Sequence, residues 1–315
     1  MGAGEGGRRH GAQLTGVVLM LAGVALICAN DAVSKYLAER YPLGQVVFVR
    51  QLAALGFILP FALATSGFAA FRVHDRQGQF LRAIAFVATS VLMLAGLAHL
   101  PLAIVTAIAF SSPLWVAALA GPALGETVSR RRLIAILIGF AGVLVILRPG
   151  GASFTWAFLL PVGTALANAV RDMLTRKLSA TESSISILIW SGFLALAVSA
   201  LALPYGWEPV ARVDMLWLVL AGLLNAAAHF TMISAYRFAD TSALSPYRYT
   251  SLIWAIAFGW LFWSHLPDGW SLVGTAIIVL AAVGAVEKNT QRTHTQRTHT
   301  QRTHTQRTHT QRTGA

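Results

Sequence analysis

The chain has 315 residues, of which 56% are hydrophobic and only 11% are charged. Its mean hydropathy of +0.63 is too high for the surface of a soluble domain of this size, which excludes a soluble enzyme or binding module and predicts a polytopic membrane protein. The net charge of +12 falls to +7 without the five arginines of the C-terminal tail, so the basic balance does not predict nucleic acid as a partner.

Ten apolar stretches follow one another along the chain, each of roughly 18 to 23 residues and therefore long enough to cross the hydrocarbon core of a bilayer. They predict transmembrane helices at 13–35, 43–66, 80–98, 101–120, 132–149, 154–175, 183–204, 213–236, 241–263 and 270–287. The first stretch continues past Cys28 without a small-residue cleavage site, which argues against a cleavable signal peptide. The predicted fold is all-α.

The chain contains an internal repeat. Residues 98–142 align without a gap on residues 237–281, at a constant offset of 139. Rare aromatic and hydroxylated positions coincide: Phe110 with Tyr249, Ser111 with Thr250, Ser112 with Ser251, Thr106 with Ser245, and Trp115 with Trp254. Because each half crosses the membrane an odd number of times, the second copy is inserted upside down. Two inverted five-helix repeats are the usual plan of a secondary transporter, whose site lies between them.

Four segments are therefore expected: an N-terminus at 1–12, repeat one at 13–150, repeat two at 151–288 and a tail at 289–315. The tail repeats the pentad Thr-Gln-Arg-Thr-His and holds no apolar residue to bury. Such a segment is predicted to be disordered, and without aromatic side chains for stacking it is not expected to bind nucleic acid.

Basic residues predict the orientation, because Lys and Arg accumulate in cytoplasmic loops. A cytoplasmic N-terminus places 13 of them inside, namely Arg8, Arg9, Arg72, Arg76, Arg82, Arg130, Arg131, Arg132, Arg171, Arg176, Lys177, Arg237 and Lys288. Only four are then outside: Lys35, Arg40, Arg148 and Arg212. Lys35 is expected to extend to the outer interface. We therefore expect a multi-pass protein of a bacterial-type inner membrane with both termini in the cytoplasm.

The segment 98–143 has an alanine-rich helix with Pro113, the loop Gly125-Glu126, and a glycine-spaced helix that ends in Ala141-Gly142-Val143. It resembles the fourth and fifth helices of the drug/metabolite transporter superfamily, EamA type. The stretch NDAVSKYLAERYPLGQVVFVRQ, at 30–51, resembles the first two helices of that family. The resemblance covers roughly 13–287 and implies ten helices as two inverted repeats that move small metabolites. Members include exporters of amino acids.

Polar side chains within apolar stretches are costly unless they face a cavity or a partner, so each is a candidate site residue. In chain order the first are Asn30 and Arg50, and Arg50 can either contact substrate or form an ion pair with Asp31. Asn168 corresponds to Asn30 at an offset of 138. For these asparagines, packing between helices and substrate contact are equally compatible with the pattern.

A polar stripe follows the stretch 213–236, with Asn225, His229, Met232 and Tyr236 at spacings of four, three and four. The matching face of 80–98 places Ser90 opposite His229 in the alignment. We expect both to line a cavity; hydrogen bonding between helices is the alternative.

Arg248 lies seven residues into the stretch 241–263, which holds no carboxylate before Asp268. An arginine fork suits a substrate carboxylate, whereas a structural arginine bonded to carbonyls at a broken helix is the alternative. The aromatic residues at the matched positions, Tyr249 with Phe110 and Trp254 with Trp115, are expected to line the substrate cavity.

Two prolines, Pro113 and Pro246, lie within the best-matched pair of stretches. Each removes a backbone hydrogen bond and kinks its helix. The offset does not pair them with each other, so we expect the hinges to break the symmetry, and both prolines are candidate gating residues.

The sequence thus predicts an exporter of small zwitterionic metabolites, most suitably amino acids with aromatic or apolar side chains, that works by alternating access. The alternative is an importer or exchanger of a larger metabolite such as S-adenosylmethionine, which some family members with a similar start carry. A membrane-embedded enzyme would need paired carboxylates or histidine clusters, which this sequence lacks. No cofactor or metal is expected. The expected partners are a small-molecule substrate and the lipid bilayer, and the pattern is compatible with a monomer.

Overall fold

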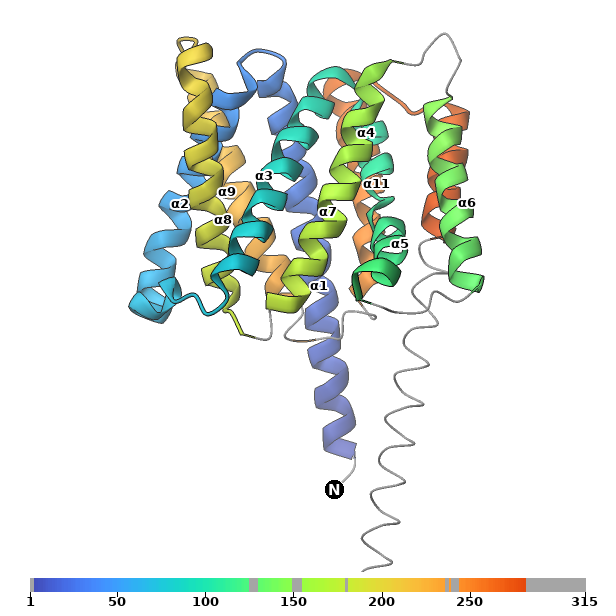
Figure 1. Ribbon diagram of the computed structural model, residues 1–315, viewed down its shortest axis with the longest axis horizontal. Coiled ribbons are helices and arrows are strands. Elements are labelled where there is room, and N and C mark those ends of the chain that lie inside the picture. Colours follow the sequence, from blue (N-terminus) through green and yellow to red (C-terminus); the bar gives the residue numbers. More distant parts are fainter. Residues whose placement is uncertain are drawn as a thin grey trace, which may run out of the picture.

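The computed structural model describes residues 3–124, 130–148, 155–178, 181–235, 238 and 244–281. The loop residue Glu126 and the tail at 289–315 lie outside this range. The helices of the described residues form ten segments when each interrupted pair is counted as one, and Figure 1 shows their arrangement. In the first half they are α1 (Ala3–Ala38), α2 (Leu43–Ser66), α3 (Arg76–His99), the interrupted pair α4 (Leu102–Ala109) and α5 (Ser112–Leu124), and α6 (Arg130–Leu147).

The second half repeats this order of elements. It consists of α7 (Leu159–Leu178), α8 (Ser184–Ala202), α9 (Arg212–Ala235), the interrupted pair η4 (Ser245–Tyr249) and α11 (Thr250–Trp263), and the helix Gly269–Ala281. Short 3₁₀ turns adjoin three of the helices: η1 (Gly67–Phe71), η2 (Trp156–Phe158) and η3 (Leu203–Tyr205). The all-α fold with ten segments, predicted from the apolar stretches, is confirmed.

The two halves run in opposite directions. In Figure 1, α1 rises from the N-terminal end of the bundle, whereas α7, the first helix of the second half, descends toward it. The last helices of the two halves, α6 and the helix Gly269–Ala281, lie against each other at one edge of the bundle. A Cβ on Gly142 would lie 2.8 Å from the carbonyl oxygen of Gly274, so only glycine permits this approach.

The apolar surface has the distribution expected in a bilayer. Five helices, the longest apolar ones, have the length and composition to cross a membrane, and shorter apolar helices complete the bundle. Large hydrophobic side chains cover the outside, for example Leu216, Leu261 and Leu280, each about 70% exposed. Because these side chains have no protein neighbours over most of their surface, lipid is the solvent that makes this exposure favourable.

The structure corrects the expectation of an asymmetric hinge. The stretch 101–120 is interrupted at Phe110 and Ser111, between α4 and α5. The stretch 241–263 changes from the 3₁₀ turn η4 to the α-helix α11 between Tyr249 and Thr250. These are the positions that the offset of 139 pairs, so the interruptions are symmetric although the prolines are not.

Local chemistry explains the first interruption. Pro113 has no N–H to donate to the carbonyl of Ala109, so the helical ladder cannot continue there. The Ser111 amide instead donates to the carbonyl of Ile108 at 2.9 Å, which tightens the turn. Pro113 consequently lies in the first turn of α5, where its fixed φ is favourable, rather than in the middle of a kinked helix.

Candidate substrate site at the paired helix interruptions

Two aromatic rings meet where the interrupted helices pass each other. The rings of Phe110 and Tyr249 lie 5.4 Å apart between centroids, at an angle of 44°. Both are half-buried, and each stands at the end of the first part of its interrupted segment. The structure therefore brings together the aromatic pair that the repeat singled out, with one ring from each half.

Buried hydroxyl groups surround the same interruptions. Thr106 is on α4, Ser111 lies between α4 and α5, and Ser251 is the second residue of α11. All three side chains are buried, and their hydroxyl oxygens have no hydrogen-bond partner in the described part of the chain. The internal repeat matches the hydroxyl positions 106 and 111 with hydroxyl positions of the second half, but the sequence pattern does not assign them to the site. Their lack of partners could be known only from the packing.

A second polar group joins α1 and α2. Arg50 is buried and donates from Nη1 to the Ser34 hydroxyl at 3.1 Å. Asn30, also buried, donates from Nδ2 to the carboxylate of Asp31 at 3.1 Å. Among the described residues Arg50 and Asp31 form no ion pair within 4.0 Å, although the two charges still interact electrostatically.

One residue of the polar stripe of α9, His229, reaches α3. The His229 imidazole lies 6.3 Å from the Phe86 ring, at 64°, which is an edge-to-face arrangement. Ser90 lies one turn beyond Phe86 on α3, and Asn168 is on α7; both are half-buried. Because α3 packs against α7, and α1 against α9 and α3, these residues come from helices at the centre of the bundle.

The remaining predicted residues separate into two groups. Arg248 is half-buried in η4, directly before Tyr249, and Pro246 is at the start of the same 3₁₀ turn. The two tryptophans make their ring contacts elsewhere: Trp115 packs edge-on against Phe140 of α6 at 4.7 Å, and Trp254 stacks on Phe258 of its own helix at 5.9 Å.

Two charged residues that the sequence predicts in a loop or at the membrane surface are buried in the structure. Arg82 is 7% exposed on α3, where its guanidinium donates to Thr175 of α7, at 3.0 Å, and to Ser191 of α8. Lys35 does not extend to the interface: it is 4% exposed, and its ammonium donates to the carbonyl of Leu97 at 2.8 Å.

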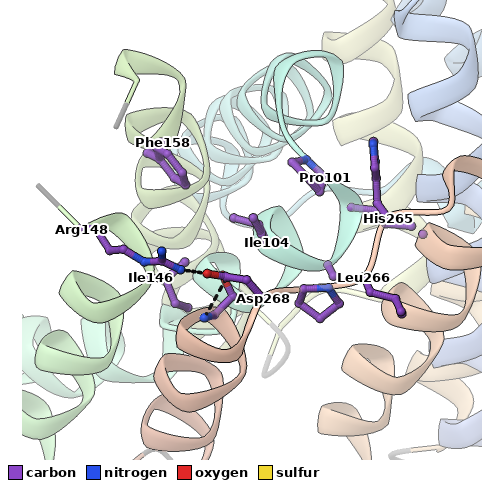
Figure 2. A pocket seen from close by; sticks show the side chains of 13 residues that line it. Pro101, Ile104, Ile146, Arg148, Phe158, His265, Leu266 and Asp268 are labelled. Carbon is purple, nitrogen blue, oxygen red and sulfur yellow. Dashed lines mark hydrogen bonds and ion pairs between the residues drawn. The ribbon is translucent and has the colours of Figure 1, made fainter. Parts of the chain in front are cut away.

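A pocket lies away from these rings, at the end of the bundle opposite the N-terminus. Figure 2 shows this cavity of about 270 Å³ between the start of α4, the end of α6 and the loop after α11. Arg148 and Asp268 form an ion pair across it and thereby join the two halves. Pro101, Phe158 and His265 also line it. The pocket is thus a vestibule at one end of the bundle, and neither Arg248 nor Tyr249 lines it.

Comparison with known proteins agrees with this architecture. The model of the EamA-like transporter family matches the chain twice, at 14–148 and 155–286. A riboflavin transporter of Rhizobium johnstonii is 30% identical, covering 87% of this chain and 91% of the relative. An S-adenosylmethionine uptake transporter of Rickettsia conorii is 28% identical, covering 89% and 96%. A pseudopaline exporter of Pseudomonas aeruginosa is 25% identical, covering 85% and 95%.

A solved crystal structure shares the fold, with a TM-score of 0.60 at 16% identity over 88% of this chain and 96% of the other. The two family matches agree with the prediction of a transporter rather than an enzyme. Together with the inverted halves and the lipid-facing apolar surface, they establish that this chain belongs to the EamA-like transporter family and is a secondary transporter of small metabolites.

Proposed function

We propose that this transporter carries a metabolite that combines a flat aromatic ring system with a polar tail, of the size of riboflavin or S-adenosylmethionine. The observation that carries the proposal is the contact between Phe110 and Tyr249, one ring from each half, at the paired helix interruptions. A planar ring can stack against such a pair, and stacking on aromatic side chains contributes roughly 0.5–1.5 kcal/mol beyond area burial.

The relatives support the same substrate class. Two of the relatives are transporters named for riboflavin and for S-adenosylmethionine, and each match covers at least 85% of both chains. Both metabolites contain a fused planar heterocycle and a flexible polar chain. The proposal therefore favours the larger metabolite over the small amino acid that the sequence first suggested.

A second candidate is the export of aromatic amino acids, which are also flat rings with a polar, zwitterionic tail. The adjacency of Arg248 to Tyr249 in η4 favours it. A guanidinium can bind a carboxylate in a bidentate manner while the neighbouring phenol ring contacts the side chain. In this case Arg248→Gln would abolish transport without loss of folded protein.

Alternating access at this site would operate as follows. The interruptions in α4–α5 and η4–α11 place irregular backbone in the middle of the bundle, where such backbone lines a cavity in transporters of inverted-repeat design. The two halves would rock about this centre, opening first one end and then the other. The excess of basic residues at the N-terminal end supports the placement of both termini in the cytoplasm of a bacterial-type cell.

Transport by purified protein in liposomes tests the proposal. Labelled riboflavin, S-adenosylmethionine, tryptophan and phenylalanine are offered separately, and exchange is measured against protein-free liposomes. We expect exchange of riboflavin or S-adenosylmethionine. Exchange of tryptophan and phenylalanine alone would favour the second candidate, and exchange of none of the four would overturn both.

The aromatic pair is tested in the same assay. Tyr249→Leu and Phe110→Leu should each raise the half-saturating substrate concentration about 3- to 10-fold, corresponding to the loss of one stacking contact. Phe68→Leu is the matched control, because Phe68 is 86% exposed in η1. Equal behaviour of all three variants would remove the aromatic pair from the site.

A further inference from the structure

Buried hydroxyl groups in this bundle fall into two classes. Some are satisfied by protein carbonyls: Thr164 on α7 donates to the carbonyl of Leu160 at 2.9 Å, and Ser199 on α8 donates to that of Ala195 at 2.7 Å, both within their own helix. This is the usual solution for serine and threonine in apolar helices. Others have no partner within the described residues, namely those of Thr106, Ser111 and Ser251, at or within one turn of the paired interruptions, and that of Thr89 on α3.

The unpartnered hydroxyls come from both halves of the protein. Ser111 is at the first interruption and Thr106 is on α4, about one turn before it, whereas Ser251 is the second residue of α11, directly after the second interruption. The rings of Phe110 and Tyr249, next to them in sequence, are in contact, and α4 packs directly on α11. The hydroxyls therefore lie on the two elements that an inverted-repeat transporter uses to hold its substrate.

An unsatisfied hydroxyl in an apolar interior destabilises the folded protein, because it loses its hydrogen bonds to water and gains none. Three such groups at one pair of interruptions are consistent with a ligand that supplies the missing bonds. The chemistry of the groups indicates what the ligand offers. A hydroxyl both donates and accepts a hydrogen bond and carries no charge, so it matches a neutral group that does the same.

We propose that Thr106, Ser111 and Ser251 form a hydrogen-bonding subsite for a neutral polyhydroxyl tail of the transported metabolite, and that this subsite determines specificity. The inference rests on the proposed function and extends it: the aromatic pair binds the ring, and the hydroxyls bind the tail. A metabolite with the ring but without the tail would lose these hydrogen bonds.

Two flavins separate the ring from the tail. Riboflavin carries a polyol chain, and lumiflavin has the same ring system with a methyl group in its place. Binding to the purified full-length protein is measured by quenching of flavin fluorescence, and uptake is measured in liposomes. The variants are Ser111→Ala and Ser251→Ala. Ser199→Ala is the control, because its side chain is equally buried but its hydroxyl is satisfied within α8.

We expect each test variant to weaken riboflavin binding about 3- to 10-fold, the loss of one hydrogen bond, while lumiflavin binding stays unchanged. Ser199→Ala should change neither. Unchanged riboflavin binding in both test variants would overturn the subsite, since water alone would then satisfy the hydroxyls. An equal loss for both flavins would also overturn it, because the serines would then act on the ring or on the fold.

A measurement without ligand separates this inference from the proposed function. If the hydroxyls have no protein partner, Ser111→Ala and Ser251→Ala should unfold at a Tm no lower than that of Ser199→Ala. A clearly lower Tm would show that the hydroxyls hold the fold together and would overturn the assignment. If the wild-type protein binds neither flavin, riboflavin is excluded as a substrate; the Tm comparison still decides whether the hydroxyls are free to bind one.

Discussion

Arg82 shows how one buried charge joins three helices. Its guanidinium is on α3 and donates to Thr175 of α7, to Ser191 and to the carbonyl of Ile187 on α8. Lysine keeps the charge but cannot reproduce this fork. We expect Arg82→Lys to lose about 1.5–3 kcal/mol of stability, the range for hydrogen bonds to a charged group, measured by unfolding in detergent. Arg76→Lys, at an exposed position of the same helix, should have no effect; equal stability of the two variants would contradict this role.

The position of Arg82 also shows what the sequence could and could not predict at the scale of residues. The pairing of Phe110 with Tyr249 followed from the offset alone, and the structure places the rings in contact. Arg82 is counted with the cytoplasmic basic residues because it lies only two residues into the stretch 80–98, whereas α3 begins at Arg76 and carries Arg82 into the bundle. Hydropathy locates the apolar part of a helix, not its polar first turns, so buried charges near helix ends escape it.

At the scale of elements, the interruption before α5 depends on one missing donor. Pro113→Ala restores an N–H that can bond the Ala109 carbonyl and so favours a continuous helix across Phe110 and Ser111. If the interruption is a gate, as the sequence predicts, the transport rate should fall about 10-fold while Tm stays equal or rises. Pro60→Ala is the matched control, because Pro60 is inside α2, away from the interruptions. Unchanged transport in Pro113→Ala would show that Pro113 does not gate.

The register of the interruptions could not be predicted from the prolines. Pro113 is at the second position of α5, but Pro246 is at the start of η4, three residues before the change to α11. The offset of 139 pairs the positions of the two helix interruptions, but it does not pair the two prolines. Pro113 follows its break and Pro246 precedes its own, so the two prolines alone do not predict the shared position of the breaks.

At the scale of the whole molecule, contacts between the halves close the end of the bundle opposite the N-terminus. Glu39, in the turn directly after α1, accepts a hydrogen bond from the indole of Trp263 on α11 at 3.2 Å. Lys35 pairs with Glu39 at 2.8 Å and lies 5.3 Å from the Trp263 ring centroid. Nearby, the phenol of Tyr41 donates to Asp214 at 2.7 Å, and this bond raises the pKa of Tyr41, so the contact persists into the alkaline range. Alternating access requires such contacts to break at each cycle.

A covalent link across this end tests whether it opens. Cys28, the single cysteine of the sequence, is first replaced by serine, and Glu39→Cys and Trp263→Cys are introduced together. A short bifunctional thiosulfonate should join the two positions, because their side chains are in hydrogen-bond contact. We expect the linked protein to lose transport in liposomes and to recover it when a reductant removes the link. Either cysteine alone should tolerate the reagent. Continued transport by the linked double variant would mean that the two halves do not separate here, and the opening at this end would then have to pass through the vestibule between Arg148 and Asp268.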